Sequence, residues 1–584
     1  HRVIGLALLG WLGLSLWAVP RGSLQLLDAL VCLGPLVVVP LGLTLIATPD
    51  RHGVHRLSYV AGVGLTGPAA LCVLLAFFLP TGTGAGLACL PWLVTTCCLA
   101  AYGAGRFLSR GSRSREETCI DVGLLYLPIG AAWLLASRAG LKPMGFGEPI
   151  VELTAAHFHY AGFAALVLCG LVGRTIRRSH HHPAVGRLLG TAEAILIPGP
   201  FLVALGISIS PLLEVVASVL LALAVLCLAS LFVGVLPGRS RGWTSASLGV
   251  AAGLTVFATM VLACMFAWGE YRERPILSID RMVLFHGLGN AVGFALLGLL
   301  SMALDPPRSR GSAPGVPFSR IRSGWNIGED FFEREGLVDH QGSPVSGLVD
   351  DLSTYKHPEF EPGDLAPDVR AFYEETDRFA IYVRPHWHPS FAGAARLWRW
   401  LSGRWNQTNL PRAPIRDAAM KTRMLPLDDR RDGRQGVRAW IRTYRGSGQV
   451  VYAAAYSTHH VGDRPYMNIA FPLLWGHMSS ILRIGRLDGR PAGLQLSSLH
   501  AGDCQGDQGV YFVLGSFVLR LPIDETIEVA PAPWAEEGFR QPPPEAEGAS
   551  VLGLHRMWVF GFPFLSLEYW LDKIDSADLP EQQA

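Results

Sequence analysis

Ten stretches of mostly apolar residues fill the first 305 residues of the chain, and each approaches the length needed to cross a bilayer. A transmembrane helix needs about 20 apolar residues to cross about 30 Å of hydrocarbon. Backbone groups inside a bilayer must find their partners within the protein, so such stretches fold as helices. We therefore predict an α-helical polytopic membrane domain of about ten transmembrane helices over residues 1–305. The ten windows begin near Val3, Leu24, Tyr59, Ala85, Cys119, Ile150, Gly186, Leu212, Trp243 and Met282.

The first window, residues 3–19, has a second interpretation. It is short and follows Arg2, which is also the pattern of a secretory signal sequence. A second apolar stretch comes directly after it, so we expect residues 3–19 to be a helix of the membrane domain.

Arginines predict the orientation of these helices. They crowd the loops after the second, fourth, sixth, eighth and tenth windows, and they are sparse in the other loops. Because cytoplasmic loops carry the excess of Lys and Arg, we expect a multi-pass protein of the cytoplasmic membrane with both termini in the cytoplasm. The arginines in question are Arg51, Arg56, Arg106, Arg110, Arg113, Arg115, Arg177, Arg178, Arg239, Arg241, Arg308 and Arg310.

The character of the chain changes after Asp305. Residues 306–315 are rich in Pro, Ser, Gly and Arg, as in a flexible linker, and no later window is apolar enough to cross a membrane. Apolar and polar residues alternate at 437–444, and the mostly apolar runs at 450–456 and 510–522 are also typical of strands. We predict a cytoplasmic, β-rich α+β domain over residues 316–584, with helices near 368–379 and 392–401.

The apolar tail at residues 557–571 of this domain leaves three alternatives open. It is too short to cross a bilayer, so it could lie on the inner leaflet, line a cavity for an apolar ligand or fill the core of the domain. His386, His388, His459 and His460 could hold a metal, although no Cys, Asp or Glu lies at a typical ligand spacing.

Composition and motifs argue against several classes of function. The formal net charge is +2 and no basic, aromatic stripe is present, which argues against nucleic acid as a partner. Ten cysteines without a Cys-x-x-Cys pair suggest neither a disulfide framework nor a zinc ribbon. Phosphate-binding and nucleophile-elbow motifs are also missing from the sequence, so no residue is predicted to be catalytic.

Three histidines inside the apolar windows are the strongest functional signal. His157 and His159 lie in the sixth window and His286 lies in the tenth; these windows run in the same direction, which places all three in the outer leaflet. Ionisable groups inside a membrane usually mark function. His157 and His159 are about 200° apart on a helix, so at most one of them can join His286 at a common centre.

Neighbouring residues extend this predicted polar pocket. Asn290 lies on the same helix face as His286, and Glu152 lies on the same face as His159. Gly289 and Gly293 form a Gly-x-x-x-Gly spacing that allows another helix to approach closely.

Three roles fit these histidines. His157, His159 and His286 could ligate a transition metal or the iron of a haem. Together with Glu152, Glu193 and Asn290 they could instead bind a small solute or an ion, or pass protons, in a transporter. They could also only hydrogen-bond between helices, which contributes about 0.6 kcal/mol on average.

Other carboxylates inside the windows require separate interpretations. Glu193 lies beside the sequence Pro198-Gly199-Pro200, and helices broken in this way form binding sites in many transporters. Asp28, Asp121 and Glu214 lie near the ends of their windows, where we expect the side chains to reach the membrane interface.

Two resemblances bear on the sixth window. The four residues HFHY at 157–160 resemble the helix of haem-copper oxidases whose two histidines ligate two haems. Such oxidases also need a copper site with further intramembrane histidines, which this chain lacks, so the resemblance leaves a haem open and excludes an oxidase. The runs PLVVVPLGL at 35–43, LTAAHFHYAGF at 153–163 and HGLGNAVGF at 286–294 resemble the YndJ-like family of bacterial polytopic membrane proteins. This resemblance implies a membrane protein or transporter.

Taken together, these features favour an integral membrane transporter or permease of a small solute or ion, with an outer-leaflet polar site and a cytoplasmic regulatory domain. The alternatives are a haem- or metal-binding membrane redox or sensor protein, and a membrane sensor or assembly factor that transports nothing.

Overall fold

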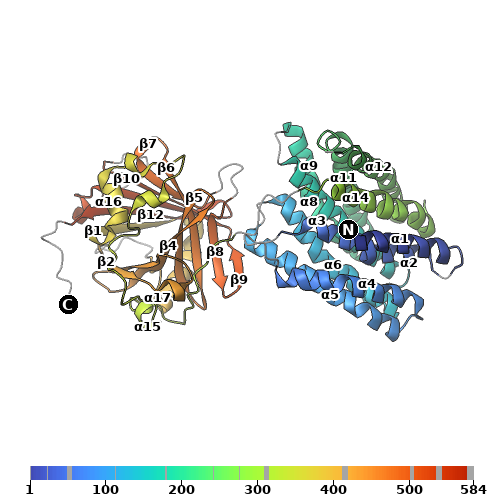
Figure 1. The fold of residues 1–584 in the computed structure, drawn as a ribbon, viewed down its shortest axis with the longest axis horizontal. Helices are drawn as coiled ribbons and strands as arrows, with labels where there is room; N and C mark the ends of the chain where they lie inside the picture. The colour runs from blue at the N-terminus through green and yellow to red at the C-terminus, as the bar shows by residue number, and fades with distance from the viewer. Residues whose placement is uncertain are drawn as a thin grey trace. The chain divides into compact units, whose positions relative to one another are not determined.

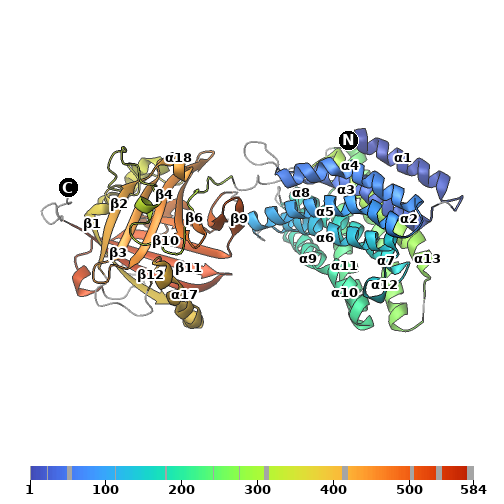
Figure 2. The same cartoon turned by 90° about the horizontal axis from the view of Figure 1, so that it is seen from below.

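The computed structural model of the chain divides into two compact units, His1–Ala313 and Pro314–Ala584. It describes residues 2–22, 24–48, 56–111, 114–177, 181–240, 242–274, 276–307, 315–410, 419–499, 506–533 and 542–574. The first unit consists of helices and the second is mainly antiparallel strands (Figures 1 and 2).

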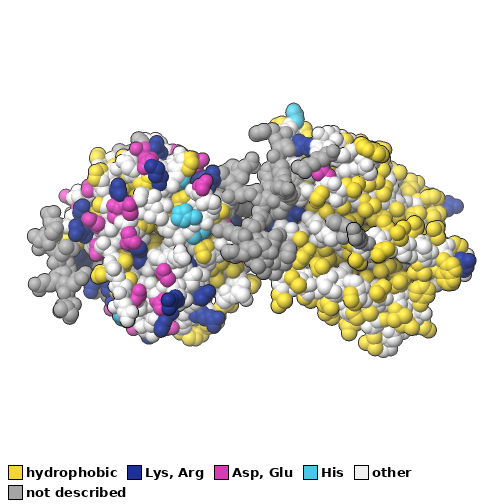
Figure 3. Space-filling view, in the orientation of Figure 1, with side chains coloured by type: hydrophobic (Ala, Val, Ile, Leu, Met, Phe, Trp, Pro, Cys, Tyr) yellow, Lys and Arg dark blue, Asp and Glu magenta, His cyan; other side chains and the backbone are white. Residues whose placement is uncertain are grey.

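Every one of the ten predicted windows is helical in the first unit, which confirms the predicted polytopic membrane domain. Within the described part of the chain, eight helices are long and apolar enough to cross a membrane, a bent pair forms a ninth candidate, and α1 is shorter. Hydrophobic side chains cover most of this unit in the space-filling view, whereas the second unit is covered with mixed charges (Figure 3). The elements are α1 (Arg2–Ala18), α2 (Leu26–Leu33), η1 (Gly34–Val38), α3 (Val39–Ile46), α4 (Leu57–Phe78), α5 (Thr83–Arg110), α6 (Arg115–Ala139), η2 (Pro143–Gly145), α7 (Ile150–His157), η3 (Phe158–Ala164), α8 (Ala165–Ile176), α9 (Pro183–Leu196), α10 (Gly199–Ile209), α11 (Pro211–Gly234), α12 (Trp243–Tyr271), α13 (Ile279–Arg281), η4 (Met282–Gly287), η5 (Gly289–Leu296) and α14 (Leu297–Leu304).

Turns of π-helix interrupt three of the spans. They are η1 in the second span, η3 in the sixth, and η4 with η5 in the tenth, and η3 contacts both η1 and η5. A π-helical turn is rare and frequently occurs at a functional site. The two histidine-bearing windows therefore meet where both depart from α-helical geometry.

The predicted close helix approach at Gly289 and Gly293 is confirmed. A Cβ atom at Gly289 would lie 2.6 Å from a methyl group of Thr259, and one at Gly293 would lie 2.5 Å from a methyl group of Thr255. Both threonines belong to α12, so the two glycines allow the tenth span to pack directly on the ninth.

Buried ion pairs join the end of α5, the start of α6 and the end of α8. The carboxylate of Glu117 accepts hydrogen bonds from Arg174 at 2.7 and 2.9 Å and from Arg106 at 2.6 Å. Asp121, about one turn further along α6, pairs with Arg106 at 2.9 Å and with Arg110. Each buried charge thus has an opposite charge in contact, as burial in a low dielectric requires.

The same arginines bond to the backbone at the end of α3. Arg106 donates to the carbonyl of Ile46 at 3.0 Å, and Arg174 donates to that of Leu45 at 3.1 Å. These carbonyls have no partner within their own helix, so the arginines cap the second span. The expectation that Asp121 reaches the membrane interface is wrong, because Asp121 is 0% exposed and its partners meet it inside the bundle.

The second unit is a closed antiparallel barrel. Its sheet runs in the order β5-β4-β3-β2-β1-β12-β11-β10-β7-β6, and a further pairing of β5 with β6 closes the ring. The hairpin β8-β9 continues the sheet beside β6, and closure removes most of the unpaired edges. The strands are β1 (Phe379–Trp387), β2 (Ala419–Pro426), β3 (Arg438–Tyr444), β4 (Val450–Val461), β5 (Arg464–Leu473), β6 (Gly476–Leu487), β7 (Arg490–Ser497), β8 (Gly509–Leu514), β9 (Phe517–Arg520), β10 (Ile523–Pro531), β11 (Val551–Val559) and β12 (Phe562–Lys573).

The predicted β-rich character of this unit is confirmed, with differences in detail. The strands expected at 437–444 and 450–456 are β3 and β4, whereas the one expected at 510–522 is split into β8 and β9 by a turn at Gly515, whose φ is +59°. The apolar tail forms β11 and β12, and Leu565, Leu567 and Leu571 fill the barrel core. The helical elements are α15 (Phe331–Arg334), η6 (Leu352–Tyr355), η7 (Pro362–Asp364), α16 (Pro367–Glu374), η8 (Thr376–Arg378), η9 (Pro389–Phe391), α17 (Ala392–Trp405), α18 (Asp429–Asp432) and η10 (Pro544–Ala546).

Candidate functional site

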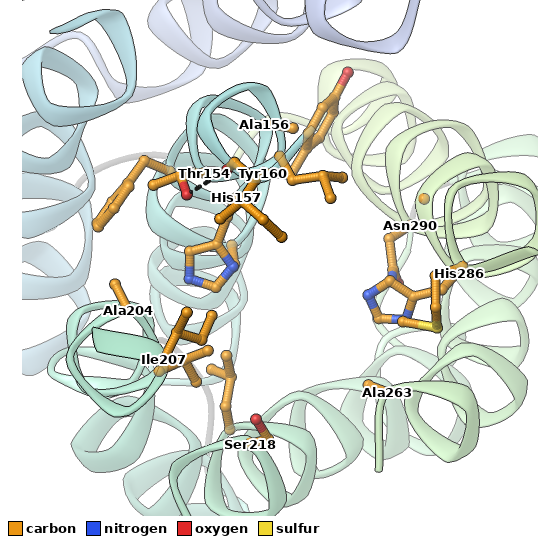
Figure 4. Close-up of a pocket in the computed structure, with 18 of the residues that line it drawn as sticks. Thr154, Ala156, His157, Tyr160, Ala204, Ile207, Ser218, Ala263, His286 and Asn290 are labelled. Carbon is orange, nitrogen blue, oxygen red and sulfur yellow. Dashed lines mark hydrogen bonds between the residues drawn. The ribbon is translucent and has the colours of Figure 1, made fainter. Parts of the chain in front are cut away.

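A cavity of about 630 Å³ lies inside the helical unit, and His157 and His286 both line it. It is located where α7, α11 and α13 begin and where α10 and α12 end, which is the opposite end of the bundle from the Glu117 network. His157 and His286 project from separate walls, with Asn290 beside His286 (Figure 4).

His157 is anchored to the break in the seventh span. Its Nε2 bonds to the carbonyl of Pro200 at 3.0 Å, and because a carbonyl only accepts, Nε2 carries the hydrogen. The helices α9 and α10 are bent by 42° to each other at this break. Pro198 and Pro200 donate no backbone hydrogen bond, so the carbonyls four residues earlier, those of Ala194 and Leu196, have no helical donor. Tyr126 also bonds at this break and donates to the carbonyl of Ile197 at 2.8 Å.

His286 belongs to a ring of hydrogen bonds with α12. Its Nδ1 bonds to the carbonyl of Thr259 at 2.9 Å, and therefore carries the hydrogen. Its Nε2 lies 3.1 Å from Nδ2 of Asn290, whose Oδ1 accepts from the Thr259 hydroxyl at 2.9 Å. The imidazole is thereby neutral, with both ring nitrogens engaged.

His159 points away from the cavity into the core of the bundle. It is 1% exposed; its Nδ1 bonds to the carbonyl of Ala155 at 2.8 Å and its Nε2 accepts from Nε1 of Trp92 at 3.0 Å. A Cβ at Gly130 would lie 2.8 Å from the ring, so α6 also packs closely on this histidine. As the helical spacing requires, His157 but not His159 shares the cavity with His286.

These hydrogen bonds restrict metal binding. A ligating nitrogen needs a free lone pair, and in His159 and His286 that lone pair accepts from Trp92 and Asn290. His157 keeps Nδ1 free of any bond to the residues that the structure describes. Within those residues no group of three or more His, Cys, Asp or Glu side chains is arranged to hold a metal, in either unit.

Glu152 and Glu193 both lie outside the lining of the cavity. Glu152 is buried on α7 and shares a hydrogen bond with Asp28, while Asp28 also accepts from the backbone N–H of Gln25 at 2.8 Å. Glu193 is 0% exposed at the other end of the bundle, where it accepts from Arg177 at 2.6 Å. Neither carboxylate can touch a molecule in the cavity in this conformation.

Among the residues that the structure describes, no Asp, Glu, Lys or Arg side chain lines the cavity. Its polar residues are few, and three of their hydroxyls are used within the protein: Thr154 donates to Ile150 at 2.8 Å, Ser208 to Ala204 at 2.9 Å, and Tyr160 to Leu30 at 2.6 Å. What faces the cavity is an apolar wall with an acceptor on His157 and an amide donor on Asn290.

Several residues that build the site were not predicted from the sequence. Thr259, Trp92 and Ser218 are ordinary residues of apolar helices, and no sequence pattern marks them as partners of histidines or as cavity lining. The Pro198-Gly199-Pro200 break was the available signal, because the carbonyl of Pro200 at this break bonds to His157.

Comparisons with known proteins agree with this architecture. A family model described as YndJ-like protein matches residues 29–294. The membrane protein YndJ of Bacillus subtilis (strain 168), described as uncharacterised, is 30% identical over 502 residues, which cover 86% of each chain. No solved structure matches the chain significantly.

Proposed function

Because the chain belongs to the YndJ-like family of integral membrane proteins, we propose that its helical unit is a carrier for a small uncharged solute. The observation that carries this proposal is the cavity of about 630 Å³, whose lining, as far as the residues are described, has hydrogen-bonding groups but no charged side chain.

The size and chemistry of the cavity support this class of solute. Sites for small molecules are commonly about 300–1,000 Å³ and mostly apolar, with a few polar groups that orient the ligand. An ion would lose its hydration here without a compensating charge, and the penalty for that is several kcal/mol. A neutral molecule with one hydrogen-bond donor for His157 and one acceptor for Asn290 avoids this penalty.

The broken seventh span supports movement of the solute. Broken helices line the substrate sites of many transporters, and their breaks allow half-helices to rotate. In this chain α10 lines the cavity while α9 is held by the Glu193–Arg177 ion pair, so α10 is the half that moves. The bond from His157 to Pro200 links solute binding to the position of α10.

For the orientation, we place the cavity on the outer side and the barrel unit in the cytoplasm as a regulatory domain. The arginine-rich ends of the spans support this, because the positive-inside rule assigns them to the cytoplasm. Both termini are then cytoplasmic.

Haem or metal binding remains a second candidate, because two histidines from different spans, His157 and His286, line one cavity. It requires the Asn290 amide to leave Nε2 of His286. A visible absorption spectrum with metal analysis tests it on purified protein and on the triple variant His157→Ala, His159→Ala, His286→Ala. A stoichiometric signal that the variant loses would replace the carrier by a redox or sensor protein.

Three probes of similar shape test the solute class: benzyl alcohol, benzoate and benzylammonium. We expect benzyl alcohol alone to raise the Tm of the protein in lipid nanodiscs, because a ligand stabilises the state that binds it. The variant Ala204→Trp fills the cavity and should abolish the shift, whereas Val219→Trp, on the exposed face of α11 outside the lining, should keep it. Stabilisation by a charged probe, or an equal shift in Ala204→Trp, would refute the proposal.

A further inference from the structure

The interior of the barrel unit contains a charged side chain that the carrier proposal does not involve. Side chains alternate along a strand, so residues paired with inward-facing neighbours also face inward. Arg442 on β3 pairs with Tyr452 on β4, which packs in the barrel core. Arg442 therefore points into the barrel, where it is only 7% exposed.

Aromatic rings surround the Arg442 guanidinium. Its central carbon lies 4.3 Å from the ring centre of Trp440 and 4.7 Å from that of Tyr452, and Tyr569 is its hydrogen-bonding partner. No ion pair to a carboxylate is found for Arg442 among the residues that the structure describes. Rings stabilise a cation, but they leave its net charge uncompensated.

The carboxylate of Glu525 inside the same barrel already has a partner. Glu525 on β10 faces inward beside Met557, and His555 lies 2.8 Å from it. Burial tends to raise the pKa of Glu525, but the hydrogen bonds from His555 and Ser480 more than offset this and hold the pKa below its ordinary value. The carboxylate of Glu525 is thus engaged by His555 and Ser480, whereas Arg442 has no carboxylate partner among the described residues.

Four buried hydrogen-bond donors without a partner lie together around Arg442. They are Nε of Arg442, Nε1 of Trp440, the hydroxyl of Tyr444 and the hydroxyl of Thr422. Trp440 and Tyr444 are two residues before and after Arg442 on β3, and Thr422 is its partner on β2, so all four face inward. Buried donors are nearly always satisfied, and each exception needs an explanation. A cluster of donors beside a cation is what an anion would satisfy.

Several side chains of the barrel core beyond this cluster are only partly buried. Trp387, Phe564, Leu473, Met478 and Met557 belong to the inward-facing core, yet they keep part of their exposure, as do Tyr452 and Tyr569 next to Arg442. These partly exposed side chains are apolar or aromatic. A molecule that reaches Arg442 would therefore have most of its body in contact with apolar groups.

We propose that the barrel unit binds a small amphipathic acid, with its carboxylate on Arg442, Tyr444 and Thr422 and its apolar body among Met478, Met557 and Phe564. The ligand supplies the carboxylate partner that Arg442 does not have among the described residues. This site is separate from the cavity of the helical unit, so the proposal for the barrel can be refuted or supported without reference to the carrier proposal.

The test uses the full chain in lipid nanodiscs and 11-(dansylamino)undecanoic acid, a fluorescent probe with an apolar chain and one carboxylate. We expect saturable binding that decanoate displaces and decanol does not. Hydrogen bonds to a charged group are worth about 1.5–3 kcal/mol, so Arg442→Gln should weaken binding by at least about tenfold. Arg445→Gln, at an exposed position in the turn after β3, is the matched control and should bind like the unaltered chain.

Tyr444→Phe removes one unpartnered donor without changing charge, and it should weaken binding by a few fold. This variant keeps the test valid if Arg442→Gln does not fold. Equal affinity in the unaltered chain, Arg442→Gln and Tyr444→Phe would overturn the proposal, since the probe would then be bound by lipid or by the helical unit. Displacement by decanol as efficient as that by decanoate would also overturn it.

Discussion

At one end of the helical unit four arginines contact four carboxylates, whereas inside the barrel unit Arg442 is buried beside aromatic rings. Every arginine of the helical network has a carboxylate in contact, although single atoms such as Nε of Arg110 have no hydrogen-bond partner, and two of these arginines also cap α3. In the barrel, by contrast, no carboxylate among the described residues pairs with Arg442, and further donors without a partner lie beside it. A buried charge that already contacts an opposite charge needs no ligand to compensate it, whereas a buried charge without such a contact is available to an anionic ligand.

The difference extends to the cavity of the helical unit. Its network of buried ion pairs lies at the end away from the cavity, and no charged side chain among the described residues lines the cavity. The helical unit thus keeps these ion pairs apart from the proposed carrier site, while the barrel places a charge inside its own proposed site. The two sites are expected to select opposite classes of ligand, neutral in the first and anionic in the second.

The largest expected effect comes from breaking the helical network at Glu117. In Glu117→Leu, Arg174 and Arg106 lose a carboxylate at 2.6–2.9 Å while they stay buried. Removing one partner of a buried pair costs about 3–5 kcal/mol. We expect this loss in the free energy of unfolding, measured by denaturant titration in bicelles. Glu270→Leu, at an exposed position, is the control, and equal stability of the two variants would contradict the assigned role.

A pH dependence of similar size is expected in the barrel unit. Burial, together with the charge of Arg434, lowers the pKa of His477 to about 4, although Asp432 partly opposes this. Between the ordinary value of 6.5 and 4, the unfolded chain binds a proton that the folded barrel does not. The free energy of unfolding is therefore undiminished above pH 6.5 and decreases as the pH falls from 6.5 to 4. At about 1.36 kcal/mol per pKa unit, the total decrease is about 3 kcal/mol.

Hydrogen exchange of peptides from β6, corrected for the intrinsic pH dependence, measures this loss. His477→Asn keeps a donor for the carbonyl of Ile321 and removes the titrating ring, so its stability should depend less steeply on pH. The same slope in both proteins would show that His477 is not the group responsible.

A smaller effect is expected where the tenth span packs on the ninth. The Cβ of Gly293→Ala would lie 2.5 Å from a methyl group of Thr255, and overpacking of this kind costs about 1–3 kcal/mol. Gly64→Ala, which meets nothing within 4 Å, should instead be neutral or stabilising. Thr255→Ala should restore the stability of Gly293→Ala; if it does not, the loss has another cause.

The smallest effect is expected for the hydrogen bond between Thr259 and Asn290 at 2.9 Å. Interhelical hydrogen bonds in membranes contribute about 0.6 kcal/mol on average. A double-mutant cycle with Thr259→Val and Asn290→Leu measures the coupling directly. A coupling near 3 kcal/mol would mean that the ring around His286 is a main source of stability rather than a means of orienting the imidazole.

Segments defined by local pattern were predictable from the sequence. Each apolar window is a helix because length and apolarity suffice for that inference. The strand β3 follows from alternation at 437–444, and β4 follows from a short run rich in Val, Tyr and Ala. Gly289 and Gly293 correctly predicted close packing, although their partner helix α12 was not identified.

Features that depend on distant partners were not predictable. Asp121 is buried because Arg106 and Arg110 of the preceding helix pair with it. The barrel requires β1 to pair with β12, which lies far along the chain, and the pairing of β5 with β6 closes the ring. The candidate site was predictable as far as His157, His286 and Asn290, which carry polar atoms in apolar windows. Its apolar wall was not, because Ala204 and Ala263 resemble any other residue of a membrane helix.

The claim that the helical unit is a carrier is tested most directly by asking whether the cavity can be reached from both sides of the membrane. Ala204→Cys and Ala263→Cys place a thiol in its wall, and a membrane-impermeant methanethiosulfonate reagent is applied to right-side-out and to inside-out vesicles. Peptide mass spectrometry separates these sites from the native cysteines, with the exposed Cys97 near the middle of α5 as a lipid-facing reference that should stay unmodified. A carrier predicts modification of both new thiols from both sides, slowed by benzyl alcohol. Modification from one side only would contradict the carrier and leave a fixed binding pocket.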